Sequence, residues 1–210
     1  MSGKAGERYY DLSAAAYIPG ATAVGIAYKD GVILGAERRI TLGNYVISKS
    51  GKKVFKVTDN VAAVCAGLIG DMQNLVREVG VYSKLKELEI KRPLRPDSVA
   101  KLMSVIMFER RYAPLITEVI VGGIDGKPKV YVLDPLGSLI QDEYAAVGTG
   151  AEMAIGVVEA SYSPGLSSKE AKDLLTSSIK AAIQRDAMSG NGIDAVTVDK
   201  NGVREESLLP

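Results

Sequence analysis

The sequence YIPGATAVGIAYKDGVILGAERR, residues 17–39, decides the fold of this chain. Two apolar runs with β-branched residues flank a turn at Asp30-Gly31, which is the pattern of a β-hairpin. The residues that end in Pro19-Gly20 are typical of a flexible leader before a folded domain. We therefore expect a leader at residues 1–20 and one domain at residues 21–210.

The rest of the chain alternates between blocks of strands and pairs of helices. Short strands are expected at residues 44–50, 52–58 and 61–68, and later at 117–125, 128–135, 138–148 and in a final hairpin at 192–207. A first helix from Asp71 has an apolar face that includes Tyr82 and Leu85, and Asp97 is expected to cap a second. A third helix follows residue 150, and a capping box at Ser167 and Glu170 opens a fourth.

Strands and helices do not alternate singly, which argues against a parallel sheet of βαβ units. Two antiparallel sheets with helix pairs outside them would bury every apolar face in the pattern. The sequence therefore predicts an α+β fold, a four-layer αββα sandwich.

Composition excludes several kinds of function. The net charge of the 210 residues is +1, which offers no electrostatic footprint for nucleic acid, and no apolar run is long enough to span a membrane. The chain contains no histidine, which excludes Ser-His-Asp chemistry and histidine metal sites, so neither a metal nor a cofactor is predicted. The one cysteine, Cys65, lies in an apolar run and favours a buried thiol in a reducing, cytoplasmic compartment.

Four short motifs could carry chemistry, and each is weak alone. Lys52-Lys53 in strand-like sequence should point to opposite faces, and an inward lysine needs an acidic partner such as Glu37. RDAMSGNG, residues 185–192, is by default a helix end and turn. AVCAGLIGD, residues 63–71, has a glycine at a strand-to-helix junction and could present free backbone N–H groups to an anion. GTG, residues 148–150, is an equally weak signal by itself.

Taken together in this order and spacing, these motifs resemble a proteasome β subunit of the archaeal type, from residue 21 almost to the C-terminus. The resemblance implies the N-terminal-nucleophile hydrolase fold and a self-processing threonine protease. In that family a leader is removed after a glycine, and the exposed threonine attacks peptide carbonyls with its own amine as base. A free α-amine with a pKa of about 7.7–8.0 suits such a role without histidine.

Carried over by position, the resemblance implies the site residues. Lys53 would be the active-site lysine, with Glu37 as its acidic partner. Asp186 and Ser189 would hold the N-terminus, with Thr149 where a serine is usual. The N–H of Gly67 would form the oxyanion hole. Thr41 and Ile69 would pair with an extended peptide substrate, and the specificity pocket would comprise Ile40, Gly51, Phe55, Cys65 and Ile69, which predicts cleavage after hydrophobic residues.

The residue at the nucleophile position is the one departure from the family's pattern. Counting back 32 residues from Lys53 gives Ala21, which also directly follows Gly20 at the expected cleavage site. Thr22 fits neither spacing, and a strand residue shifted by one points to the other face. Since alanine has no hydroxyl, this chain should neither remove its leader nor cleave peptides.

Two explanations stay open for the alanine. One is an engineered Thr→Ala replacement, favoured because the supporting residues all remain; the other is a naturally inactive subunit that only supports ring assembly. A third alternative, an α-type ring subunit, is disfavoured by Pro19-Gly20 and Lys53. As partners, the resemblance implies a heptameric β ring, α-subunit rings, unfolded polypeptide substrates and an ATPase unfoldase upstream.

Overall fold

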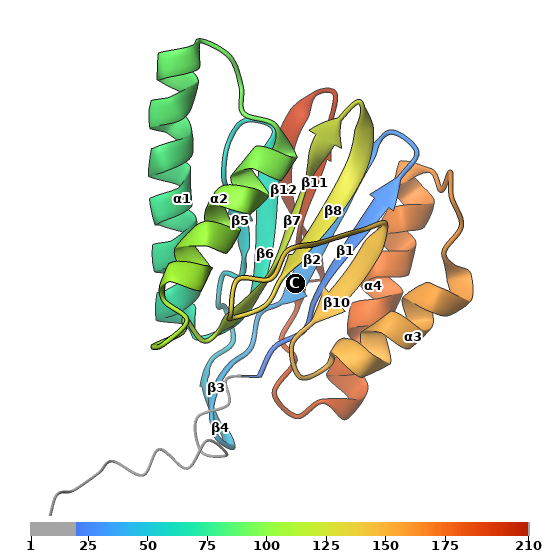
Figure 1. Cartoon of the computed structure of the whole chain (residues 1–210). Helices are drawn as coiled ribbons and strands as arrows, with labels where there is room; N and C mark the ends of the chain where they lie inside the picture. Colours follow the sequence, from blue (N-terminus) through green and yellow to red (C-terminus); the bar gives the residue numbers. More distant parts are fainter. Residues whose placement is uncertain (1–19, 210) are drawn as a thin grey trace, which may run out of the picture.

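The computed structural model describes residues 20–209, which form four layers (Figure 1). The predicted αββα sandwich is confirmed: two five-stranded antiparallel sheets lie face to face, with one helix pair outside each. Their strand orders are β10-β1-β2-β11-β12 and β5-β6-β7-β8-β9. The strands are β1 (Ala23–Tyr28), β2 (Gly31–Glu37), β3 (Ile40–Leu42), β4 (Tyr45–Ser48), β5 (Val54–Lys56), β6 (Val61–Gly67), β7 (Thr117–Asp125), β8 (Lys127–Leu133), β9 (Ile140–Asp142), β10 (Tyr144–Val147), β11 (Ile193–Asp199) and β12 (Gly202–Leu209).

Four helices cover the outer faces of the sheets. Helices α1 (Ile69–Ile90) and α2 (Pro96–Glu109) pack on the second sheet, and α3 (Ala151–Ser161) and α4 (Ser168–Arg185) pack on the first. The predicted capping box of α4 is present, with Ser167 and Glu170 each bonding the other's backbone. None of the helices within residues 20–209 is both long and apolar enough to cross a membrane.

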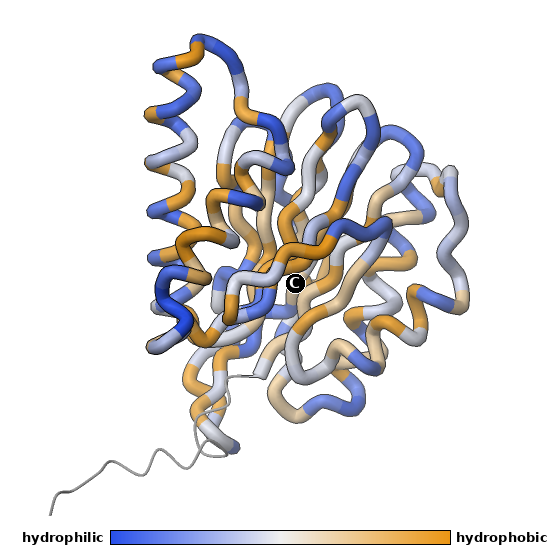
Figure 2. The backbone as a smooth tube through the Cα atoms, viewed as in Figure 1, coloured by the Kyte–Doolittle hydropathy of each residue, from blue (hydrophilic) through white to orange (hydrophobic). Residues whose placement is uncertain are grey.

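Three apolar layers hold the sandwich together. One lies between the sheets, a second between the second sheet and α1–α2, and a third between the first sheet and α3–α4. Every residue of β1 and β2 is buried, because both faces of the first sheet are covered. Figure 2 accordingly shows hydrophobic segments along the central strands and hydrophilic ones at the loops and outer helix faces.

The hairpin at the start of the fold has its turn one residue earlier than expected. Tyr28 pairs with Gly31, so the loop consists of Lys29 and Asp30. Gly31 belongs to β2, where a Cβ atom would lie 2.5 Å from the carbonyl oxygen of Val198 in the neighbouring strand. Close approach of two strands therefore requires this glycine, while the turn is made by the residues before it.

Three other local predictions were wrong. Asp97 does not cap α2: the N-cap is Arg95, with Pro96 in the first turn. The expected strand at 138–148 is two strands, β9 in the second sheet and β10 in the first, so this segment crosses between the layers. Tyr82 and Leu85 of α1 are 50% and 59% exposed, and no residue of α1 after Ser83 is buried.

Candidate active site

The β3–β4 hairpin projects from one end of the sandwich (Figure 1). A cleft of about 240 Å³ is lined in part by residues of this hairpin. It brings together segments that are far apart in sequence: the start of the described chain, the segment after β2, the approach to β5 and the β6–α1 junction. The lining residues are Gly20, Arg39, Ile40, Thr41, Leu42, Ile47, Lys53, Gly67, Leu68, Ile69 and Gly70.

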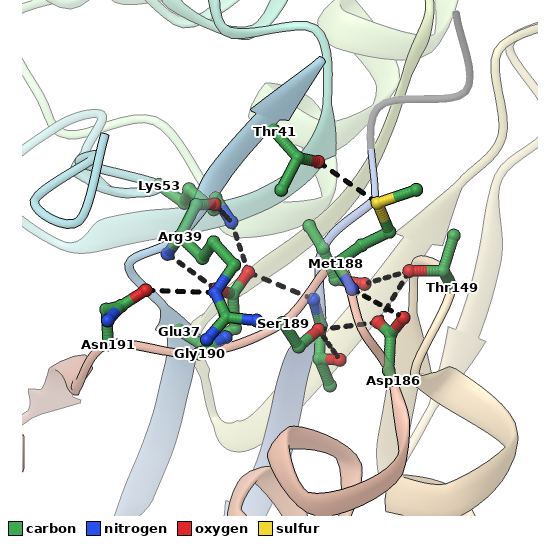
Figure 3. A network of polar contacts seen from close by, with 12 residues as sticks. Glu37, Arg39, Thr41, Lys53, Thr149, Asp186, Met188, Ser189, Gly190 and Asn191 are labelled. Carbon is green, nitrogen blue, oxygen red and sulfur yellow. Dashed lines mark hydrogen bonds and ion pairs between the residues drawn. The ribbon is translucent and has the colours of Figure 1, made fainter. Parts of the chain in front are cut away.

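A buried ion pair lies at the base of this region (Figure 3). The Nζ of Lys53 contacts Oε1 of Glu37, and the two side chains are only 2% and 0% exposed. Nζ also donates to the carbonyl oxygen of Arg39 at 2.6 Å. The Oε2 of Glu37 accepts hydrogen bonds from the backbone N–H groups of Arg39 at 2.6 Å and Gly190 at 2.9 Å. Each buried charge thus has several partners, as burial demands.

Burial shifts both members of the pair toward their neutral forms. Loss of solvent raises the pKa of the Glu37 carboxyl, against the ammonium of Lys53 and the hydrogen bonds it accepts. Loss of solvent also lowers the pKa of Lys53, against the attraction of the Glu37 carboxylate. A lysine whose pKa is lowered in this way can exchange protons with a neighbouring hydroxyl more readily than a surface lysine can.

A second polar cluster lies beside Ala21, two residues before β1. Oδ2 of Asp186, at the C-cap of α4, accepts hydrogen bonds from the hydroxyls of Thr149 at 2.6 Å and Ser189 at 2.7 Å. The carbonyl oxygen of Ala21 accepts a hydrogen bond from the N–H of Gly150 at 3.3 Å and lies 3.4 Å from the Thr149 hydroxyl. The loop before α3 therefore holds the chain at position 21, and the loop after α4 supports it through Asp186.

Ala21 and Thr22 differ in the direction of their side chains. The methyl group of Ala21 lies in the apolar layer between the sheets. Thr22 is completely buried on the other side, and its hydroxyl lies 2.7 Å from that of Ser189. A Cβ atom on Gly150 would lie 2.0 Å from the Thr22 hydroxyl, so no space is left there for a substrate. The Thr22 hydroxyl is therefore held between Ser189 and Gly150, and Thr22 is not among the residues that line the cleft.

Gly67 lies at the end of β6 and borders the cleft. Its φ of +139° favours glycine, and a Cβ atom would lie 2.2 Å from the carbonyl oxygen of Ile116. Glycine at this corner of the cleft is therefore required by its backbone conformation and by the close approach of the chain at Ile116 and Thr117.

The six predicted substrate residues divide into two groups. Ile40, Thr41 and Ile69 line the cleft. Cys65 is fully buried in the core under α1 and α2, where burial raises the pKa of its thiol, and Phe55 packs against the same core. Gly51 is covered by the side chain of Ile40. The apolar lining of the cleft also includes residues that the sequence analysis did not name: Leu42, Ile47 and Leu68.

Sequence analysis also missed Arg39, which holds the loop after α4. Its guanidinium donates to Oδ1 of Asn191 at 2.9 Å and to the carbonyl of Ala187 at 2.8 Å. It lies over Gly190, where a Cβ atom would meet it at 2.3 Å. No local signal distinguishes Arg39 from Arg38, which turns instead to Asp194.

Met188 was also missed. Its side chain lies against Gly20 and reaches Thr41, whose hydroxyl donates to the sulfur at 3.2 Å (Figure 3). Within residues 20–209, no three histidine, cysteine, aspartate or glutamate side chains lie together so that they could hold a metal ion.

Comparison with known proteins identifies the family. A family model described as "Proteasome subunit" matches residues 19–198. The chain belongs to the proteasome subunit family. The residues matched span the sandwich up to β11, and so include every element that borders the cleft of this proteasome subunit.

Curated relatives are named as β subunits. The chain is 52% identical over 188 residues to proteasome subunit beta 1 of Cenarchaeum symbiosum, covering 90% of this chain and 97% of that one. It is 53% identical over 190 residues to proteasome subunit beta 2 of Pyrobaculum calidifontis, covering 90% and 94%. The predicted resemblance to β subunits of the archaeal type is confirmed.

Proposed function

We propose that this proteasome subunit carries the site of a threonine-type endopeptidase without its nucleophile. The buried Lys53–Glu37 pair and the cluster around Asp186 together carry this proposal, because both contact the chain on either side of position 21. The N–H of Thr22 donates to Oε1 of Glu37 at 3.4 Å, and the hydroxyl of Thr149, bonded to Asp186, lies 3.4 Å from the carbonyl oxygen of Ala21, where the side chain has no hydroxyl. A buried ion pair does not need to exist for stability alone, since well-packed apolar residues often serve as well.

The chemistry follows from placing a threonine at position 21. In self-processing, its hydroxyl would attack the carbonyl carbon of Gly20; the peptide C–N bond would break and leave an ester. The break of the C–N bond frees the amine of residue 21, and water would then hydrolyse the ester, which frees the hydroxyl of residue 21 and leaves a carboxylate on residue 20. Lys53 would stabilise the developing alkoxide, and the N–H of Gly67 would stabilise the oxyanion.

The freed amine would then serve as general base for peptide cleavage. Ser189 and Thr149, both bonded to Asp186, would hold this amine in position. Residues 1–20 are the proposed leader, and of these only Gly20 lies within the described residues. Because alanine cannot attack, we propose that the bond between Gly20 and Ala21 stays intact and that the chain is inactive.

Two origins of the inactivity remain under this proposal. The retained charged pair and hydroxyl cluster support an engineered Thr→Ala replacement. A naturally structural subunit is the second candidate, supported by the complete burial of Ala21, whose methyl group fits the apolar layer between the sheets. For either, we propose a cytoplasmic assembly with heptameric β rings, α-subunit rings and an ATPase unfoldase that supplies unfolded polypeptides.

The test is peptidase activity in the Ala21→Thr variant, measured on assembled protein with fluorogenic peptides. The original chain should be inactive, and Ala21→Thr should cleave. Ala21→Thr combined with Lys53→Ala should lose at least about a hundredfold in rate, since the hydroxyl would have no activating cation. Assembled Ala21→Thr protein without activity would reject the enzyme site and leave the structural subunit.

A further inference from the structure

We propose that Met188 is the specificity-determining residue that restricts position 20 to glycine. The inference rests on the proposed function, because it concerns which junction the site can process. It adds a residue outside the charged pair and the hydroxyl cluster, and it assigns a physical cause to the glycine before position 21.

The observation is a direct steric conflict. A Cβ atom built on Gly20 would lie 1.9 Å from Cβ of Met188 and 2.3 Å from its Cγ. Real Cβ atoms do not approach other atoms so closely, so one of the two segments would have to move. The conflict involves the base of the Met188 side chain, and a change of rotamer cannot relieve it because Cβ is fixed by the backbone.

The backbone of Met188 is held in place. Its N–H donates to Oδ1 of Asp186 at 3.0 Å, and the next N–H, of Ser189, donates to the carbonyl of Asp186 at 3.2 Å. The following residue, Gly190, bonds Glu37. Movement of Met188 away from Gly20 would therefore disturb the same loop that positions Asp186.

The sulfur of Met188 is held by Thr41, which lines the cleft. Thr41 is 8% exposed, and its hydroxyl donates to the Met188 sulfur at 3.2 Å. On the remaining side, the Thr149 hydroxyl would lie 2.9 Å from a Cβ atom on Gly20. Position 20 is thus enclosed by two fixed side chains, and Met188 makes by far the closer contact.

The first arm of the test needs no catalysis. Gly20→Ala in the chain as it stands should lower the melting temperature by about 5 °C, as overpacking does in a domain of this size. The same change in a Met188→Gly background should cost less than half of that shift. Met188→Ala is the matched control: it retains the conflicting Cβ atom, so it should not relieve the cost. An equal cost in all three backgrounds would overturn the proposal.

The second arm measures leader removal by intact mass in the Ala21→Thr background. Gly20→Ala should slow processing at least about tenfold, and adding Met188→Gly should recover most of the rate, whereas Met188→Ala should not. If Gly20→Ala is processed at the original rate, Met188 does not select glycine. If Ala21→Thr is itself never processed, the proposed function fails, and the melting temperatures of the first arm still decide whether Met188 excludes a side chain at position 20.

Discussion

Lys53 and Glu37 form an ion pair in which both side chains are almost completely removed from solvent. The pair joins the approach to β5 to the end of β2, and backbone N–H groups of Arg39 and Gly190 complete the coordination of the carboxylate. Removing one partner would leave an unpaired charge in the interior. The pair can therefore be tested by the free energy of unfolding as well as by activity.

Lys53→Met should destabilise the chain by about 3–5 kcal/mol, because the carboxylate of Glu37 would lose its countercharge. The double variant Glu37→Gln with Lys53→Met should cost less than the sum of the single changes. Urea unfolding at matched chain concentration measures both. Lys52→Met is the control: Lys52 pairs with Glu205 at the surface and is 55% exposed, so its loss should cost less than about 1 kcal/mol. Equal costs for Lys52 and Lys53 would contradict the burial of the pair.

Arg39→Ala should loosen the loop that carries Asp186 and Ser189. Its guanidinium bonds Asn191 and Ala187, and loss of two such bonds should accelerate amide hydrogen exchange in residues 187–191 by about tenfold or more. Arg38→Ala is a matched control, because that guanidinium bonds Asp194 and Ser207 instead. If both variants accelerate amide hydrogen exchange in this loop to the same extent, Arg39 does not specifically hold the loop in place.

The β11–β12 hairpin should contribute a pH-dependent part of the stability. The Arg204 guanidinium holds the pKa of Asp199 below its ordinary value. An acid with a lowered folded pKa stabilises the fold fully above its unfolded pKa of about 3.9, and loses that contribution as pH falls through the folded value. Asp199→Asn should therefore be less stable by about 0.5–1 kcal/mol at pH 6, after allowance for the exposed arginine. The difference should vanish near pH 2; a constant difference in urea unfolding across this range would contradict the assignment.

Cleavage by the Ala21→Thr variant should favour hydrophobic residues before the scissile bond. The cleft wall carries the apolar side chains of Ile40, Leu42, Ile47, Leu68 and Ile69. Peptides with leucine or phenylalanine at that position should be cut at least about tenfold faster than peptides with arginine or aspartate, by kcat/KM. A preference for arginine or aspartate would show that other residues form the pocket.

Local sequence patterns predicted the architecture because each element buries a face of its own. β1 and β2 are continuous apolar runs since both of their faces are covered, and the helices show the period of one covered face. The wrong predictions lie where packing against residues distant in sequence determines the local structure. Nothing local divides residues 138–148 between two sheets, and the pattern of α1 gave no sign that burial stops at Ser83.

The candidate site was predictable in part for the same reason. The Lys53–Glu37 contact followed from the need of an inward lysine for an acid, and the resemblance supplied Asp186, Ser189 and Thr149. The contacts of Arg39 and Met188 were not predicted, because they depend on two loops that approach each other in the fold. Periodicity in the sequence gives no sign of such an approach. The enzymatic roles of all these residues stay predictions.

The most direct test of the central claim is the intact mass of the assembled chain with and without Ala21→Thr. The account predicts that the original chain keeps residues 1–20, whereas Ala21→Thr yields a mature chain that begins at residue 21. Retention of the leader by assembled Ala21→Thr protein, or its removal at Gly20 in the original chain when that chain is assembled alone, would contradict it.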